Sequence, residues 1–434
     1  MAKLWDKGFN VSKRIEDFTV GKDRELDLLL APYDIQGTIA HITMLESVGL
    51  LGKDELDALT KELKSILRMA ENGSFRIDDD VEDVHSQVEL MLTEKLGDLG
   101  KKVHTGRSRN DQVLLDVKLF TRAGIKKTAL KVKALFDALI DASDRYKDVL
   151  MPGYTHLQVA MPSSFGLWFG AYAETLCDDL QMLSAALKLS DRNPLGSAAG
   201  YGSSAPLNRQ KTTDLLGFES MVYNSVAAQM NRGKLEREVS FALSCIAETL
   251  GRFASDCCLF NSQNFGFISL PDEMTTGSSI MPHKKNPDVF ELIRAHCNKI
   301  CGVPETIRLI TTNLPSGYFR DMQILKEAYL PVFGELCDCL DIALFAVQNM
   351  SVKENIMEDP KYKTAFSVEE VNRLVSEGVP FRDAYKQVGM SVLEGKFEFK
   401  GELRHTHEGS LGNLCNDRIR QRMDRIIQDI CPEG

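Results

Sequence analysis

Residues 277–288 carry the side chains best suited to chemistry. Their sequence, Gly-Ser-Ser-Ile-Met-Pro-His-Lys-Lys-Asn-Pro-Asp, places a hydroxyl at Ser278, an ammonium group at Lys284 and an amide at Asn286. A hydroxyl beside a cation suits removal of a proton next to a carboxylate, because the cation stabilises both the alkoxide and the negative charge that develops on the substrate. A flexible glycine and two prolines would let such a segment close over a small anion. The alternative is an ordinary surface loop.

Residues 104–113 place two guanidinium groups at the expected start of a long helix. Arg107 and Arg109 carry these groups, and the polar side chains of Ser108 and Asn110 lie next to them. Guanidinium forks bind carboxylates bidentately, and the unpaired N–H groups of a helix N-terminus add donors for an anion. This pattern predicts a dicarboxylate site. The alternative is a capped helix start, with the arginines paired to nearby acids.

Two further segments carry weaker signals. His156 follows a Pro-Gly turn in polar company, and its near-neutral pKa would let it donate a proton to a leaving nitrogen or orient a group that does. A lone histidine is more often structural. The segment 315–326 supplies a phenol, an amide and an ammonium group, at Tyr318, Gln323 and Lys326.

Long helices are expected to position these segments. Proline is absent between positions 32 and 152, 206 and 271, and 331 and 360, and such gaps permit long helices. In the second gap, apolar residues recur at spacings of three and four, as one buried helical stripe requires. They are Leu235, Val239, Ala242, Ile246, Leu250 and Phe253. Strand-like alternation is rare, so the sequence predicts a mainly α fold built as a bundle.

Polar connections around 97–106 and 354–363 predict three domains. Their expected bounds are 1–106, 107–355 and 356–434. The stretch 165–176 is apolar on more than one face, so its helix must be covered by neighbours or by other subunits. This pattern motivates the hypothesis of an oligomer.

Composition narrows the class of protein. The 434 residues include 43% hydrophobic and 26% charged residues, as in soluble globular proteins, and a net charge of -10 argues against nucleic acid as a partner. No apolar run approaches the roughly 20 residues that span a bilayer, and Met1–Gly21 lacks an apolar signal core, so we expect a cytoplasmic protein. Ten cysteines without framework spacing fit that compartment, and Cys297 and Cys301 lack a second ligand pair, so we expect no structural metal.

Together, these segments resemble the three sequence regions of the aspartase/fumarase superfamily, whose active sites gather one region from each of three subunits. Residues 277–288 are similar to its Gly-Ser-Ser-x-Met-Pro-x-Lys-x-Asn-Pro signature, and 104–113 and 315–326 are similar to the argininosuccinate lyase family within it. The resemblance runs from about Lys3 to about Ala384. It implies a three-domain fold whose central long-helix bundle packs into a tetrameric helical core.

The resemblance also implies an activity. The expected enzyme is a homotetramer that cleaves argininosuccinate to arginine and fumarate, the last step of arginine biosynthesis, without a metal or cofactor. Two alternatives stay open: another fumarate-releasing lyase such as adenylosuccinate lyase, or an inactive structural homologue like the lens proteins of this family.

The same resemblance assigns roles to residues. Ser278 would be the base that removes the Cβ proton of the succinyl group, while Lys284 and Asn286 hold the carboxylate. His156, with Glu291 as its charged partner, would protonate the leaving nitrogen directly or through water. Matched substrate contacts are Asp23 or Asp27, His85 in a segment with Asp83, Ser108, Arg109, Asn110, Thr155, Arg232, Tyr318, Gln323 and Lys326.

The chain departs from the family pattern in places. His283 stands where these lyases usually have glutamine, and Ala227 stands where an aspartate is common. Residues 18–23 lack an expected serine, and 193–200 form an unusual version of their loop. These departures concern fine substrate contacts and leave the base, the cation and the arginine clamp in place.

Overall fold

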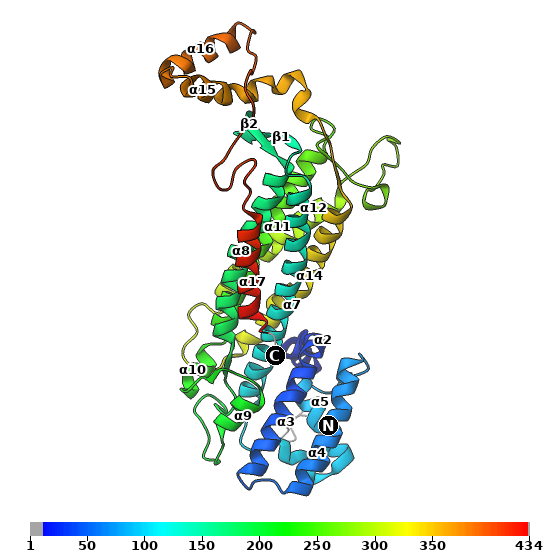
Figure 1. The fold of residues 1–434 in the computed structure, drawn as a ribbon. Helices are drawn as coiled ribbons and strands as arrows, with labels where there is room; N and C mark the ends of the chain where they lie inside the picture. Colours follow the sequence, from blue (N-terminus) through cyan, green and yellow to red (C-terminus); the bar gives the residue numbers. More distant parts are fainter. Residues whose placement is uncertain (1–11, 433–434) are drawn as a thin grey trace. The chain divides into compact units, whose positions relative to one another are not determined.

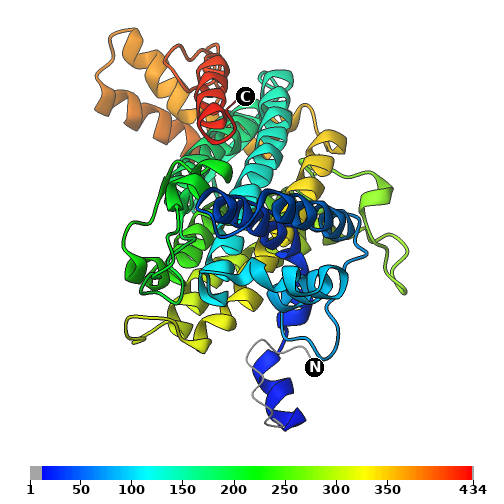
Figure 2. The same ribbon diagram turned by 90° about the horizontal axis from the view of Figure 1, so that it is seen from below.

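The computed structural model describes residues 12–432, and most of this part of the chain is helical (Figures 1 and 2). The strands found there are short and form two-stranded sheets. The prediction of a mainly α fold is confirmed. The beginning of the resemblance, at Lys3, lies outside the described residues. No helix within 12–432 combines the length and apolar composition that crossing a membrane requires.

The chain forms two compact units. The first contains Met1–Thr128, Met182–Ser244 and Ile300–Glu335. Its shorter elements are α1 (Lys13–Val20), α2 (Asp23–Leu26), η1 (Asp27–Leu29), α3 (Ala31–Ser47), α4 (Lys53–Glu71), α5 (Val84–Leu96), α6 (Asp98–Lys101), β3 (Arg192–Asn193), α9 (Arg209–Leu215), β4 (Ser220–Met221), α10 (Ser225–Met230), α13 (Val303–Ile310) and η4 (Arg320–Gln323). Helices α3, α4 and α5 lie together in Figure 1 and bury one core that includes Leu45, Leu59 and Val88.

The second unit contains Ala129–Gln181, Cys245–Lys299 and Leu336–Gly434. Its shorter elements are β1 (Leu150–Thr155), β2 (Gln158–Ser164), β5 (Ile268–Ser269), α12 (Asp288–Cys301), β6 (Ser351–Val352), α15 (Ser367–Ser376), α16 (Phe381–Leu393) and α17 (Asn416–Ile430). An aromatic cluster binds its helices together: Trp168 stacks on Phe253 at 5.5 Å between ring centroids, and Phe253 meets Phe290 edge-on at 6.2 Å.

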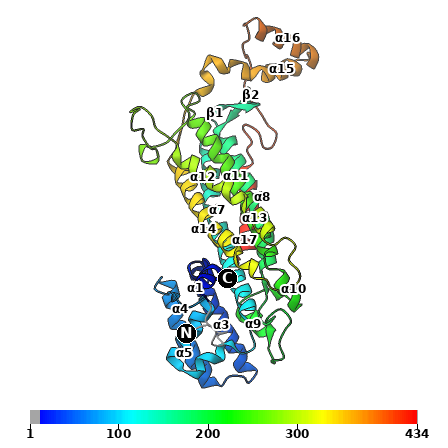
Figure 3. The ribbon, with the colours of Figure 1, turned by 180° about the vertical axis from the view of Figure 1, so that it is seen from behind.

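Four long helices contribute residues to both units. They are α7 (Arg109–Arg145), α8 (Phe165–Ser190), α11 (Lys234–Asn261) and α14 (Leu325–Asn349). Within the second unit their segments run alongside one another in Figures 1 and 3. With 37 residues, α7 is about 55 Å long. The stripe predicted between Leu235 and Phe253 is buried along α11, which confirms that prediction.

A long helix covers much of the third proline gap, as expected, but it begins before the gap. Helix α14 begins at Leu325 and contains Pro331, although proline removes a backbone donor and usually interrupts a helix. Packing in the first unit explains why the helix continues, because Phe333 packs edge-on against Phe120 of α7 at 5.4 Å. The division into three domains, near residues 106 and 355, stays a prediction.

Candidate active site

A cavity of about 320 Å³ in the first unit collects most of the predicted substrate contacts. Its lining residues are Asp23, Asp27, Glu82, Asp83, His85, His104, Ser108, Arg109, Asn110, Val113, Arg232, Tyr318, Arg320, Gln323 and Lys326. Glu82 and Arg320 were not predicted from the sequence. Each lies within three residues of a predicted position, Glu82 beside the Asp83–His85 segment and Arg320 inside 315–326. Proximity to those segments was the only signal that could have found them.

The start of α7 forms a reciprocal cap at the cavity edge. The Ser108 hydroxyl accepts a hydrogen bond from the Asn110 amide at 3.2 Å, and the Asp111 carboxylate accepts one from the Ser108 amide at 2.9 Å. This pattern satisfies backbone donors at a helix N-terminus and fixes the first residue of the helix, Arg109. The capped helix start that the sequence allowed as an alternative is therefore present.

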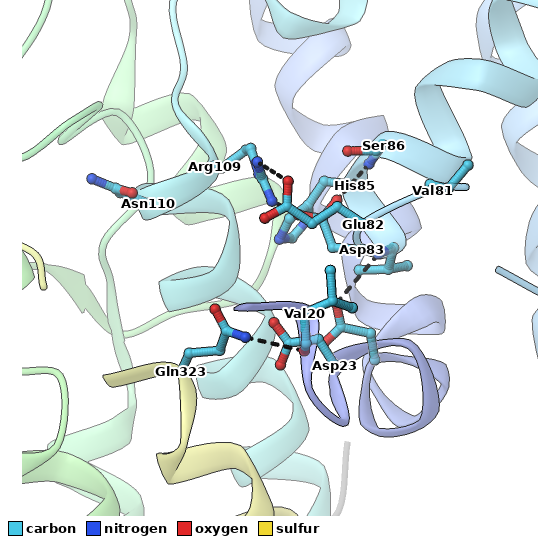
Figure 4. Close-up of polar contacts among 12 residues, drawn as sticks. Val20, Asp23, Val81, Glu82, Asp83, His85, Ser86, Arg109, Asn110 and Gln323 are labelled. Atoms are coloured by element: carbon cyan, nitrogen blue, oxygen red, sulfur yellow. Dashed lines mark hydrogen bonds and ion pairs between the residues drawn. The ribbon is translucent and has the colours of Figure 1, made fainter. Parts of the chain in front are cut away.

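Arg109 is paired with acids inside the same cavity (Figure 4). Its Nη1 lies 3.2 Å from Glu82 Oε2, and its Nη2 forms an ion pair with Asp83. Glu82 also accepts from Arg320, at 2.7 Å. Burial raises the pKa of Asp83, but the charges of His85 and Arg109 outweigh burial and lower that pKa to about 2. Arg109 is therefore part of an ion-pair network, and its contact with a substrate carboxylate stays a prediction.

Lys326 and two aspartates form a second ion-pair group in the cavity wall. Lys326 Nζ lies 2.7 Å from Asp23 Oδ1 and 2.7 Å from Asp27 Oδ1, and the lysine is only 5% exposed. Burial, the largest influence, raises the pKa of Asp23 to about 6 although Lys326 opposes it. Burial lowers the pKa of Lys326, but the charges of Asp27 and Asp23 raise it above its usual value. The ammonium group is thus held charged between two carboxylates.

Gln323 and Arg232 make structural contacts in this single chain. Gln323 Nε2 donates to the carbonyl oxygens of Thr19 and Val20 at 2.7 and 3.1 Å, as Figure 4 shows for Val20. Arg232 is buried against Glu236 and donates to the Met322 carbonyl at 3.2 Å. In the same view the Asn110 side chain points away from the Arg109 cluster. Direct substrate contacts of these residues stay predictions.

His156 and Thr155 lie in the second unit, on the hairpin of β1 and β2. Thr155 pairs with Gln158, so His156 and Leu157 form a two-residue turn. Both have positive φ, 56° and 57°, which defines a type I′ turn and is rarely adopted by side chains of this size. His156 is exposed at this tip, where it borders a pocket of about 600 Å³ whose wall includes Trp168.

The strained turn gives a stability prediction. Leu157→Gly is expected to raise the free energy of unfolding by about 0.5–1 kcal/mol, because a left-handed backbone costs a leucine more than a glycine loses in chain entropy. Urea denaturation followed by circular dichroism measures it. Leu393→Gly, at the exposed end of α16, is the control and should give no gain. An equal or lower stability for Leu157→Gly would show that the turn stores no strain.

The signature segment is a loop whose ends are pinned together. Thr276 and Asn286 exchange backbone hydrogen bonds of 3.3 and 2.9 Å. Inside the loop, the Ser278 hydroxyl oxygen accepts from the amides of Ile280 and Met281 at 3.4 and 3.2 Å. These bonds form a local serine turn, and the role of Ser278 as a base stays a prediction. Lys284 is exposed nearby in the chain.

Helix α12 follows this loop and corrects one expectation. The sequence Asn286-Pro287-Asp288 predicts a helix capped by Asn286 with proline at its first position. In the structure the carbonyl of Pro287, rather than that of Asn286, accepts from the amides of Phe290 and Glu291, so the helix begins one residue later than predicted. The Asn286 side chain instead donates to Thr276 at 3.4 Å. Glu291 is exposed on α12 and makes no ion pair with His156 within residues 12–432 of one chain. Their pairing stays a prediction.

Comparison with known proteins decides the family. A family model described as lyase matches residues 10–302. The argininosuccinate lyase of Bacteroides thetaiotaomicron is 64% identical over 425 residues, which cover 98% of this chain and 95% of that protein. The chain belongs to the argininosuccinate lyase family. This confirms the resemblance seen in residues 104–113 and 277–288, and it makes the chain a carbon–nitrogen lyase by family.

Solved structures of other lyases share the fold of this argininosuccinate lyase family member. EDDS lyase in complex with formate has a TM-score of 0.77 at 21% identity, covering 97% of this chain and 91% of that one. A class II fumarase from Schistosoma mansoni has a TM-score of 0.73 at 18% identity, covering 98% and 94%. The mainly α, aspartase/fumarase-type fold is thereby confirmed.

Proposed function

We propose that the protein cleaves argininosuccinate to arginine and fumarate. The observation that carries this proposal is the 64% identity, over nearly the full length of both chains, to a protein named argininosuccinate lyase. The same similarity disfavours adenylosuccinate lyase as the activity. We place the enzyme in the cytoplasm and in arginine biosynthesis, as the sequence predicts.

The first step of the proposed reaction is removal of the Cβ proton. The Ser278 alkoxide takes this proton and becomes a hydroxyl, while the electron pair moves onto the adjacent carboxylate. Lys284 and Asn286 stabilise the resulting dianion, since a cation and an amide donor favour charge that develops in the transition state. The two backbone amides that point at Ser278 Oγ support its role as the base.

The second step is cleavage of the C–N bond. The electron pair returns to form the double bond of fumarate, and the leaving guanidinium nitrogen of arginine receives a proton. We propose His156, directly or through water, as the donor, with Glu291 as its charged partner. Its place at an exposed, strained turn suits a group that must reach a substrate, because strain of this kind tends to occur at functional sites.

The polar cavity supplies the substrate contacts in this proposal. Argininosuccinate carries carboxylates together with an ammonium and a guanidinium group. The cavity offers both signs of charge, with acidic Asp23, Asp27, Glu82 and Asp83 and basic His85, Arg109, Arg232, Arg320 and Lys326. Such a mixed lining fits a substrate with both kinds of group better than it fits fumarate alone.

We propose that the active enzyme is a homotetramer with composite sites. The catalytic loop and His156 belong to the second unit, whereas the cavity belongs to the first. The long helices also expose large apolar side chains, including Phe241, Ile342 and Phe345, which a partner subunit would cover. Sedimentation that shows a clean monomer at working concentration would remove this proposal.

The substrate test compares two succinylated compounds. The purified protein is incubated separately with argininosuccinate and with adenylosuccinate, and fumarate is followed by its ultraviolet absorbance. Fumarate from argininosuccinate alone is the expected result. Fumarate from adenylosuccinate alone would replace the proposal by the alternative lyase, and fumarate from neither would indicate an inactive structural homologue.

A further inference from the structure

His85 stands between the cavity and a buried pair of carboxylates. It lines the cavity, yet it is only 6% exposed. Its Nδ1 lies 2.7 Å from Asp34 Oδ1 and 3.6 Å from Asp116 Oδ2. Asp34 comes from α3 and Asp116 from α7, while His85 lies in the first turn of α5. Three helices of the first unit therefore meet at this imidazole.

The two carboxylates have little else to bind. Asp34 and Asp116 are 2% and 1% exposed, and one oxygen of each, Oδ2, has no hydrogen-bond partner in the described structure. Buried carboxylates are costly unless a positive charge compensates for the loss of water. Neither aspartate has a role in the site predicted from the sequence. Both lie close to His85 Nδ1, so their role is to be sought in their effect on His85.

We propose that Asp34 and Asp116 are positioning residues that hold His85 as a fixed imidazolium in the cavity wall, where its charge binds a carboxylate of the substrate. This inference rests on the proposed function, because it assumes a dicarboxylate in the cavity. His85 was already expected to contact the substrate; the new elements are its fixed positive charge and the two aspartates that maintain it.

The charges around the ring support an imidazolium. Burial lowers the pKa of His85, but the carboxylates of Asp34, Asp83 and Asp116 outweigh burial and raise that pKa to about 9. One cation also faces the cluster, because buried Arg107 interacts with Asp34 and Asp116. Burial and the charges of Arg107 and His85 lower the pKa of His104 to about 4, so the nearby His104 adds no positive charge near neutral pH. Arg109 and Asp27 complete the charged surroundings, next to Asp83 and Asp116 respectively. Burial and the charge of Asp34 raise the pKa of Asp116 well above its usual value, so Asp34, the acid closest to Nδ1, has the larger effect on the charge of His85.

A bound metal ion explains the geometry less well. His85 Nδ1, Asp34 and Asp116 offer ligand atoms within 4.8 Å of one another, so they could hold a cation. However, ligands about 2.1 Å from a tetrahedral zinc ion lie roughly 3.4 Å apart, whereas 2.7 Å between Nδ1 and Asp34 is the length of a charge-assisted hydrogen bond. The buried guanidinium of Arg107 already interacts with Asp34 and Asp116, and its positive charge disfavours a divalent metal ion at the same carboxylates. A proton on His85 accounts for the contacts.

The experiment measures fumarate binding by isothermal titration calorimetry at pH 6 and pH 8, which needs no turnover. In the natural protein, His85 is protonated at both values, so its contribution to fumarate affinity should not change between them. In Asp34→Asn the imidazole is expected to lose its proton between pH 6 and pH 8, so affinity should fall at least tenfold over that range. His85→Gln should bind weakly at both pH values and lack this additional step.

Controls separate positioning from folding. Glu369→Gln removes the carboxylate 3.1 Å from His405, far along the chain, and should leave fumarate binding unchanged. Should Asp34→Asn not fold, Asp116→Asn gives the same test with a smaller shift, because that carboxylate lies farther from Nδ1. Circular dichroism melting curves confirm that each variant is folded.

Three results would overturn the inference. Asp34→Asn and Asp116→Asn could bind fumarate with the pH dependence of the natural protein, or lose equal affinity at pH 6 and pH 8, as a structural role predicts. Stoichiometric Zn²⁺ binding that disappears in Asp34→Asn would show a metal site instead. The proposed function is tested apart from this: if the natural protein cleaves argininosuccinate, that function stands whichever result His85 gives.

Discussion

Ser278→Ala is expected to lower kcat for argininosuccinate cleavage by about 10²–10⁴-fold while changing KM little. In the proposed mechanism Ser278 is the only base, and the hydroxyl acts in the transition state rather than in substrate binding. The amides of Ile280 and Met281, which donate to Ser278 Oγ, would then stabilise an alkoxide that the alanine variant lacks. Steady-state kinetics with argininosuccinate, read as fumarate absorbance, measures both constants.

The neighbouring serine gives a matched control. Ser279 is exposed in the same loop, and the structure shows no hydrogen bond of its hydroxyl to the amides that serve Ser278. Ser279→Ala should therefore keep kcat within a few-fold of the natural value. A near-normal kcat in Ser278→Ala would end the assignment of the base, and a loss confined to Ser279→Ala would transfer it to the second serine.

Lys326→Met should have the largest effect on stability, lowering the free energy of unfolding by about 3–5 kcal/mol. The substitution leaves Asp23 and Asp27 buried without the ammonium group that lies 2.7 Å from each. Removing one partner of a buried ion group costs more than the pair contributes, because the remaining charge stays away from water. Urea denaturation near neutral pH measures the difference.

The pH dependence of this variant has a definite sign. Burial already raises the pKa of Asp23 to about 6, and removal of Lys326 takes away the charge that opposes the shift. The folded variant then binds protons more tightly than the unfolded chain, so its stability falls as pH rises from the unfolded pKa, near 3.9, through the folded pKa. Lys326→Met should accordingly be more stable at pH 5 than at pH 8, relative to the natural protein.

An exposed pair provides the control for Lys326. Lys53 Nζ lies 3.0 Å from Asp57 with both side chains largely in water, so Lys53→Met should leave the free energy of unfolding nearly unchanged. Equal effects of the two substitutions would show that the Lys326 group contributes no more than a surface ion pair.

Helices could be predicted from local sequence where apolar residues recur at spacings of three and four, so that one face of the helix is buried. The stripe from Leu235 to Phe253 appears in α11 as expected, because its residues face one core. The gap between Pro331 and Pro360 likewise permitted a long helix, and α14 occupies much of it, but the helix begins before the gap and contains Pro331. The contact of Phe333 with Phe120 joins residues far apart in the chain, which local sequence does not reveal.

The cationic residues of the candidate site could be predicted from the sequence, but the acidic residues that pair with them could not. The arginine of the 104–113 segment and the lysine of 315–326 were recognisable as cations that suit carboxylates. Their partners were not, because Arg109 meets Glu82 and Lys326 meets Asp27 only after separate helices pack. For the same reason no spacing rule links Asp34 to His85, which lie 51 residues apart in sequence and 2.7 Å apart in space.

The pinned ends of the signature loop bear on how this enzyme can diverge. Since Thr276 and Asn286 hold the loop at its base, residues between them can be exchanged without moving the anchors or the Ser278 turn. His283 is exposed there and makes no hydrogen bond or ion pair in the described structure, so no contact within this chain requires a histidine at the position where the family pattern predicts glutamine. Exposed positions of the loop other than Ser278, Lys284 and Asn286 can therefore vary while the two anchors stay paired.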